Sequence, residues 1–120
     1  MPCCGNPTDA KVAQAPATPE SRRRRAAVLK ALAHPVRLLF VDELAAGERC
    51  VCELRELAGL DMSTVSKHLS VLKNAGIVRD DKRGQWVYYH LCCPCLTGFF
   101  ACIDDILFPA RGPAGKRTGL

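Results

Sequence analysis

The order of apolar and polar residues between positions 52 and 91 is the feature that most constrains how this chain can fold. Apolar residues at helical spacing indicate helices, and strict alternation indicates strands. The segment predicts a short helix at 52–58, a tight turn at 59–61, a helix at 63–74, and strands at 77–81 and 85–91 joined by a turn at 82–84. A short helix, a turn, a second helix and a hairpin, in this order, are typical of a winged helix-turn-helix domain.

The flanking sequence predicts three further helices. Two precede the short helix, one from Arg22 to the residue before Pro35 and one from Pro35 to Gly47, because proline suits the first turn of a helix. The third runs from Pro94 to Phe108 and carries a broad apolar surface. Such a surface on a terminal helix of a small domain indicates a seam between two copies of the chain.

These elements predict a mainly α domain with a small β-hairpin (α+β), dimeric through its terminal helices. The predicted winged helix-turn-helix domain spans residues 22–108. Residues 1–21 hold four of the eight prolines and are expected to form a disordered tail. Residues 109–120 are expected to form a flexible basic tail.

The outer face of the helix at 63–74 carries small hydroxyl groups and lysines and no carboxylate. Because a carboxylate would repel phosphates, this composition suits contact with the backbone and base edges of DNA. The residues expected to contact DNA are Ser63, Thr64, Ser66, Lys67, Ser70 and Lys73, with Lys82 and Arg83 from the tip of the hairpin. An ordinary solvated helix face is the alternative. His68 lies beside the apolar stripe, so a packed histidine and a DNA contact both stay open.

Length and composition exclude several classes of protein. At 120 residues the chain is one small domain and not a multi-domain enzyme. Apolar runs fall short of the roughly 18 residues that a membrane helix needs, and the first residues lack a signal-peptide pattern, so a cytoplasmic protein is expected. The Cys-x-x-Cys spacing at 92–95 follows a hairpin rather than a βαβ unit, and a phosphate-binding glycine loop is absent. We therefore expect no enzymatic activity.

The chain holds eight cysteines, at positions 3, 4, 50, 52, 92, 93, 95 and 102. Cytosolic thiols are kept reduced, so structural disulfides are not expected in such a protein. Clustered cytosolic cysteines indicate soft-metal ligands or redox sensors instead.

Four stretches of the sequence carry a resemblance to a known family. They are HPVRLLF (34–40), RCVCEL (49–54), DMSTVSKHLSVLKNAGIV (61–78) and RGQWVYYHL (83–91). Together they resemble the ArsR/SmtB family of metal-responsive repressors, with CVCEL and GQWVYY closer to its arsenic-responsive branch. The resemblance implies a homodimer that binds double-stranded operator DNA until As(III) or Sb(III) binds as inducer. It implies neither an organic cofactor nor a membrane partner.

The cysteines determine which inducer suits the chain. Trivalent arsenic and antimony take about three thiolates arranged as a pyramid. In an ideal helix Cys50 and Cys52 point about 200° apart, so one ion could bind both only where the turn is distorted. Arsenic-responsive relatives carry a third cysteine at the position of Arg55, so the pair lacks one ligand here.

Two other groups of cysteines could supply the missing ligand. Cys3 and Cys4 could reach the pair from the predicted tail, as tail cysteines do in cadmium- and lead-responsive relatives. The second group could form a site of its own, because it offers four thiols between positions 92 and 102. The predicted main inducer site is therefore Cys92, Cys93, Cys95 and Cys102, with Cys50 and Cys52 as a secondary site.

Alternatives within the same fold stay open. One is a thiol redox switch, in which cysteines of the second group form disulfides. Another is a repressor that responds to cadmium or lead, because soft thiolates also suit these ions. The zinc site of zinc-sensing relatives is not expected, since the terminal helix offers Asp104 and Asp105 but no histidine.

Overall fold

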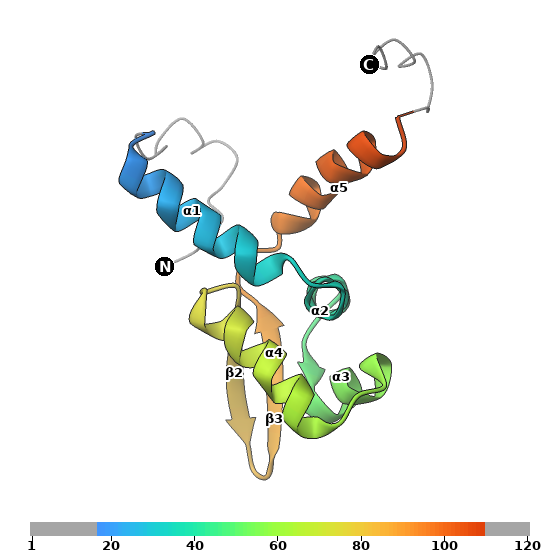
Figure 1. Cartoon of the computed structure of the whole chain (residues 1–120). Helices are drawn as coiled ribbons and strands as arrows, with labels where there is room; N and C mark the ends of the chain where they lie inside the picture. Colours follow the sequence, from blue (N-terminus) through green and yellow to red (C-terminus); the bar gives the residue numbers. More distant parts are fainter. Residues whose placement is uncertain (1–16, 110–120) are drawn as a thin grey trace.

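A computed structural model describes residues 17–109 and contains five helices and a three-stranded sheet within that range (Figure 1). The elements are α1 (Pro19–Leu32), α2 (Pro35–Ala45), β1 (Arg49–Cys50), α3 (Val51–Ala58), α4 (Met62–Asn74), β2 (Val78–Arg83), β3 (Trp86–Leu91) and α5 (Leu96–Leu107). The predicted α+β winged helix is confirmed. Most of both predicted tails, 1–21 and 109–120, lies outside the described residues, and so do Cys3 and Cys4.

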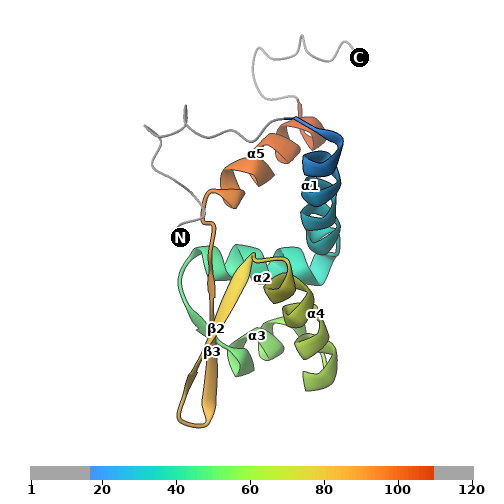
Figure 2. The same cartoon turned by 90° about the vertical axis from the view of Figure 1, so that its left-hand side faces the viewer.

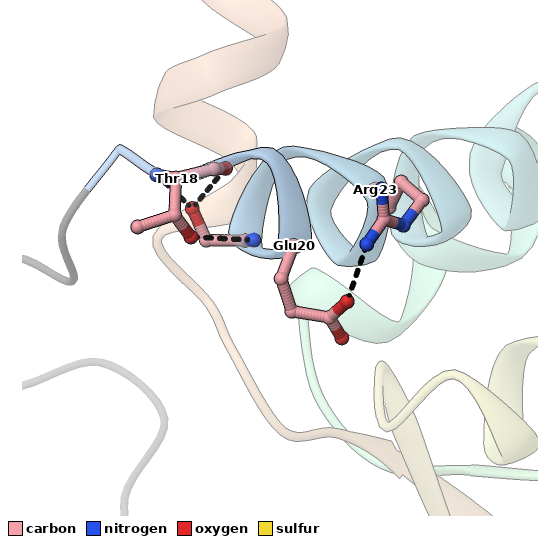
Figure 3. Close-up of polar contacts among 4 residues, drawn as sticks. Thr18, Glu20 and Arg23 are labelled. Carbon is pink, nitrogen blue, oxygen red and sulfur yellow. Dashed lines mark hydrogen bonds and ion pairs between the residues drawn. The ribbon is translucent and has the colours of Figure 1, made fainter.

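The first helix begins before Arg22, where the sequence pattern had placed its start. Thr18 caps α1, because its hydroxyl accepts the Ser21 amide at 3.1 Å and the Ser21 hydroxyl accepts the Thr18 amide at 3.1 Å (Figure 3). This reciprocal pair satisfies two backbone donors that a helix start otherwise leaves open. Glu20 then pairs with Arg23 at 2.8 Å on the exposed face of the first turns. Residues 19–21, which the sequence pattern assigns to the tail, therefore belong to the capped helix.

The core forms where α2, α3 and α4 meet the sheet. Val65, Leu69 and Leu72 of α4 are fully buried, as their helical spacing predicts. They pack in one cluster with Phe40 of α2 and Leu54 of α3. The burial of these five side chains places the opposite face of α4 in solvent, which positions the candidate DNA contacts.

The wing contains a strand that periodicity did not predict. β1 pairs antiparallel with β3, so the strand order is β1-β3-β2. Two residues are too few to show an alternating pattern, which is why this strand escaped the sequence analysis. The hairpin turn also differs from the prediction: β2 continues through Arg83, which pairs with Trp86, and Gly84 takes a positive φ of 66° in the turn.

The last helix stands away from the core, as both views of the ribbon show (Figures 1 and 2). It begins at Leu96 rather than at Pro94, and only Leu96 and Phe100 pack against the core. Its other large apolar side chains are exposed, together with the residue that follows the helix: Phe99, Ile103, Ile106, Leu107 and Phe108. Among the described residues, no helix has the length and apolar character needed to span a bilayer.

Candidate functional site

The predicted DNA-contacting residues of α4 lie on one solvent-facing surface. Ser63, Ser66, Lys67, Ser70 and Lys73 are exposed, and Thr64 is half-buried. A shallow groove runs along this surface, lined by Arg37 of α2 and by Thr64, Ser66, Lys67, His68, Ser70 and Val71. Apart from Arg37, the residues along the groove all belong to α4. The exposed face of α4 thus carries hydroxyl and cationic groups, as the sequence pattern predicts.

A carboxylate at the start of α4 changes the chemistry of two of these residues. Asp61 accepts the Ser63 hydroxyl at 2.6 Å, the Thr64 hydroxyl at 2.7 Å and the Thr64 amide at 3.1 Å. These hydrogen bonds from Ser63 and Thr64 hold the pKa of Asp61 well below its usual range. Both hydroxyls therefore donate within the protein and can only accept from a partner. The sequence signal was an aspartate followed by hydroxyl residues before a helical run, which is a typical N-cap.

The cations of the wing are unequally available. Arg83 forms ion pairs with Glu48 and with Asp81, and its guanidinium lies 4.6 Å from the centre of the Tyr88 ring. Lys82 is exposed, and within residues 17–109 no ion pair engages it. Of the two predicted DNA contacts in the wing, Lys82 is thus more available to bind a phosphate than Arg83.

Lys73, the last predicted contact on α4, is also tied to the wing. Its Nζ lies 3.1 Å from Asp80 Oδ2 of β2. The pair joins the C-terminal end of α4 to the hairpin, so the two candidate DNA-contacting elements are linked at their surface.

His68 packs within the protein, which was one of the two alternatives for this residue. Arg37 Nε donates to His68 Nδ1 at 3.1 Å, and the rings of His34 and His68 are 4.3 Å apart. His34 in turn accepts the Val36 amide at 3.0 Å and so caps α2. Burial, with His34 and Arg37 nearby, lowers the pKa of His68. Helical periodicity did not predict this cluster, because its members are distant in sequence.

Cys50 and Cys52 converge without any distortion of the helix, contrary to the expectation for an ideal helix. Their Sγ atoms lie 2.9 Å apart. The reason is that Cys50 ends β1 and caps α3 with extended backbone angles, φ −74° and ψ 149°, so only Cys52 is helical. Glu53 completes the cap by accepting the Cys50 amide at 2.9 Å.

The proximity of Cys50 determines how Cys52 titrates. A hydrogen bond with Cys50, partial burial and the charge of Cys50 raise the pKa of Cys52. The Cys52 thiol therefore holds its proton more tightly than an isolated cysteine. A cation that binds both sulfurs must displace that proton, so its affinity should rise with pH.

Three of the C-terminal cysteines, Cys92, Cys93 and Cys95, lie between the sheet and α5. The Cys92 amide donates to Ile77 O at 2.9 Å and so extends the hairpin by one bond. Cys93 Sγ lies 3.7 Å from Sγ of Cys95, and Cys102 is exposed on α5. Cys95 is disulfide-bonded in this structure, contrary to the expectation that the cysteines are all reduced. One ion with metal–sulfur bonds of about 2.3 Å can join sulfurs up to roughly 4.6 Å apart, so the Cys50/Cys52 pair is close enough. Cys93 and Cys95 are also within this distance, but Cys95 can bind an ion only after its disulfide is reduced.

A complete three-ligand site is not assembled in the part of the chain that the structure describes. Between residues 17 and 109, histidine, cysteine and carboxylate side chains do not gather in a group of three or more able to hold an ion. Each close pair of cysteines would need at least one further ligand, from another position or from a second copy of the chain.

Sequence comparison assigns the chain to a family. Residues 34–80 match the family described as "Bacterial regulatory protein, arsR family". An uncharacterized HTH-type transcriptional regulator of Methanocaldococcus jannaschii is 32% identical over 88 residues, which cover 72% of this chain and 99% of that protein. The arsenical resistance operon repressor of Escherichia coli is 39% identical over 81 residues, covering 65% and 67%. The chain belongs to the ArsR family.

Members of the ArsR family differ in length from this chain. The arsenic resistance transcriptional regulator of Pseudomonas putida is 46% identical over 68 residues, which cover 53% of this chain and 51% of that protein. The matched segment thus spans about half the length of some curated relatives.

Solved structures of transcriptional regulators share the fold. The homodimeric winged helix-turn-helix DNA-binding domain from Mycobacterium bovis matches with a TM-score of 0.68 and 30% identity, over 83% of this chain and 96% of that one. The transcriptional repressor BigR from Xylella fastidiosa matches with a TM-score of 0.64 and 28% identity, over 89% and 100%. The chain is accordingly a DNA-binding regulator of transcription and not an enzyme.

Proposed function

We propose that this ArsR-family protein represses transcription as a homodimer on operator DNA and leaves the DNA when As(III) or Sb(III) binds its cysteine thiolates. The observation that carries the proposal is the position of the two close cysteine pairs. Cys50 belongs to β1, and Cys93 and Cys95 follow closely after β3, so both pairs adjoin the sheet of the wing. With the Cys95 disulfide reduced, an ion bound at either pair would pull on an element of the predicted DNA-binding surface.

The DNA-binding mode follows from the exposed face of α4. Ser66, Lys67 and Ser70 would enter the major groove, where small hydroxyls and lysines can reach base edges and phosphates. Lys82 and Arg83 would approach the flanking minor groove or the phosphate backbone. A dimer would place two such helices about one turn of DNA apart.

We assign the main inducer site to Cys92, Cys93, Cys95 and Cys102, and a secondary site to Cys50 and Cys52. The argument is the number of ligands, because metalloid binding uses about three thiolates and Cys50 and Cys52 offer only two. The short chain between the C-terminal cysteines also keeps the entropy cost of bringing them together low. Arsenic-resistance relatives support the choice of inducer.

Differential affinity of the ion for two forms of the dimer is sufficient for release from DNA. The ion need only bind more tightly to the form of the dimer in which the two α4 helices fit the major groove of DNA poorly. Because ligation releases thiol protons, inducer affinity should rise with pH up to the ordinary thiol pKa of about 8.5.

Two double variants test the proposal and the ranking of the sites. In the presence of reductant, arsenite and antimonite should release the parent protein from a DNA fragment that carries its own promoter region. Cys92→Ser/Cys93→Ser should stay on the DNA at those inducer concentrations, whereas Cys50→Ser/Cys52→Ser should still respond. The reverse result would make the pair at α3 the primary site.

Parallel titrations with Cd(II) and Zn(II) measure which ion the thiolates prefer. Release by Cd(II) but not by arsenite would replace the metalloid with a soft divalent ion as inducer. Release by oxidant alone, with every ion inactive in reductant, would identify a thiol redox switch instead.

A further inference from the structure

Arg83, at the end of β2, is held by three groups from different parts of the wing. Its Nη2 pairs with the Glu48 carboxylate, its Nε lies 3.0 Å from Asp81 Oδ2, and its guanidinium lies 4.6 Å from the Tyr88 ring centre. Two carboxylates and an aromatic face thus surround one cation. Glu48 is the partner that is remote in sequence, since it precedes β1.

The same contacts lead back to the cysteine pair at α3. Glu48 stands two positions before Cys50, with only Arg49 between them. Cys50 lies directly opposite Tyr88 in the sheet, and Tyr88 is the residue whose ring faces Arg83. Cys50, Tyr88, Arg83 and Glu48 therefore form a closed loop of covalent, cross-strand and charge contacts.

A displacement of Cys50 disturbs this loop, because Cys50 is one of its members. The short β1 offers little resistance to such a displacement. With only two residues, β1 has few ladder bonds to hold it against β3. Binding of an ion at Cys50 and Cys52 would draw β1 toward the third ligand and shift both Glu48 and the contact with Tyr88. The guanidinium of Arg83 responds to both, since it touches both.

We propose that Glu48 and Tyr88 are positioning residues that transmit the ligand state of the Cys50/Cys52 pair to Arg83 at the tip of the wing. The inference rests on the proposed function, in that a thiophilic ion binds this pair. It adds a route by which ion binding at this secondary site changes DNA binding, namely through the wing as well as through α3 and α4.

The chain carries its own reporter for this route. Trp86 is the single tryptophan, it is half-exposed, and it pairs with Arg83 across the hairpin. Its fluorescence therefore monitors the tip of the wing without DNA. Absorbance of arsenic–sulfur bonds in the ultraviolet measures binding of arsenite in the same sample.

The experiment is a double-mutant cycle read by Trp86 fluorescence. Arsenite should change the fluorescence of the parent, and Cys50→Ser/Cys52→Ser removes the part of the change that depends on this pair. Glu48→Gln should lose at least about half of that part while binding the same amount of arsenite. In the Cys50→Ser/Cys52→Ser background, Glu48→Gln should have no further effect.

Glu20→Gln is the matched control, because it removes an exposed ion pair with Arg23 on α1, away from the wing (Figure 3). It should leave the fluorescence response intact. Arsenic–sulfur absorbance with an undiminished response in Glu48→Gln would overturn the coupling alone. Absence of that absorbance in the parent would overturn both the metalloid function and the coupling.

A DNA-binding assay provides the second measurement. The ratio of DNA affinities without and with arsenite should fall by about two- to fivefold in Glu48→Gln, as expected for an exposed ion pair. A change of DNA affinity that is equal with and without arsenite would mean that Glu48 acts only through its charge, which would also overturn the coupling.

Discussion

At the residue scale, His68 links α4 to α2. Its Nδ1 accepts from Arg37 of α2, and its ring contacts His34, which caps the same helix. Only a neutral imidazole can accept at Nδ1, and a charged one would face the Arg37 guanidinium at close range. Protonation of His68 therefore removes one hydrogen bond between α4 and α2.

This dependence predicts a loss of stability in mild acid. The pKa of His68 is lowered in the folded protein, so the unfolded chain, with a histidine pKa of about 6.5, takes up the proton first. Stability that is present above that pH is lost as the pH falls toward the folded pKa. His68→Gln keeps an acceptor for Arg37 but does not titrate, so its urea midpoint should change less between pH 7.5 and 5.5.

His90→Gln is the control for His68→Gln, because His90 lies in β3 outside this cluster. It should retain the pH dependence of the parent. An equally steep pH dependence in His68→Gln would show that the cluster does not control stability in this range.

At the element scale, α4 has one face packed in the core and one face exposed to solvent, and the exposed face carries the predicted DNA contacts. Val65, Leu69 and Leu72 are buried, while Ser66, Lys67 and Ser70 are exposed. A substitution on the exposed face can therefore change DNA binding without opening a cavity in the core.

The double substitution Ser66→Ala/Lys67→Ala should abolish specific DNA binding and leave metalloid affinity within about a few fold. Loss of one phosphate contact should also lower the slope of log affinity against log salt by about 1. Fluorescence anisotropy with a labelled promoter fragment at several salt concentrations measures both effects. Lys30→Ala, which removes an exposed lysine of α1, should keep specific binding. Full promoter affinity in a folded double variant would remove α4 from the interface.

At the scale of the whole molecule, α5 presents more apolar surface than a single copy of the chain covers. Leu96 and Phe100 contact the core, but Phe99, Ile103 and Ile106 face solvent. Apolar groups exposed together on a terminal helix are typical of an interface. The related domain from Mycobacterium bovis is homodimeric, which is consistent with dimerisation, and the use of α5 as the interface stays a prediction.

Ile103→Asp should convert the protein to monomers, because it places an unpaired charge within the apolar surface of α5. DNA binding should weaken as well, since two recognition helices are no longer held one turn of DNA apart. Analytical ultracentrifugation measures the change in mass. Asp104→Asn, on the neighbouring position of the same helix, should remain dimeric. A dimer of unchanged size in Ile103→Asp would place the interface elsewhere.

The sequence by itself determined the helices, the hairpin and the inward face of α4. Each of these is encoded within a few residues, by periodicity, by prolines at helix starts and by a glycine in the turn, so local preference is sufficient. The residue types on the outer face of α4 were predictable for the same reason. Burial of Val65 and Leu69 required no knowledge of their neighbours beyond the helical repeat.

Only the tertiary structure decided how distant residues meet. The convergence of Cys50 and Cys52 depends on β1, which exists because β3 lies beside it. The contact of Arg37 with His68 and the pair of Glu48 with Arg83 join residues that are far apart in the chain. Such contacts form only when the packed core brings separate elements together, and no local pattern records them. The candidate sites could therefore be predicted by residue type, but their geometry was set by packing.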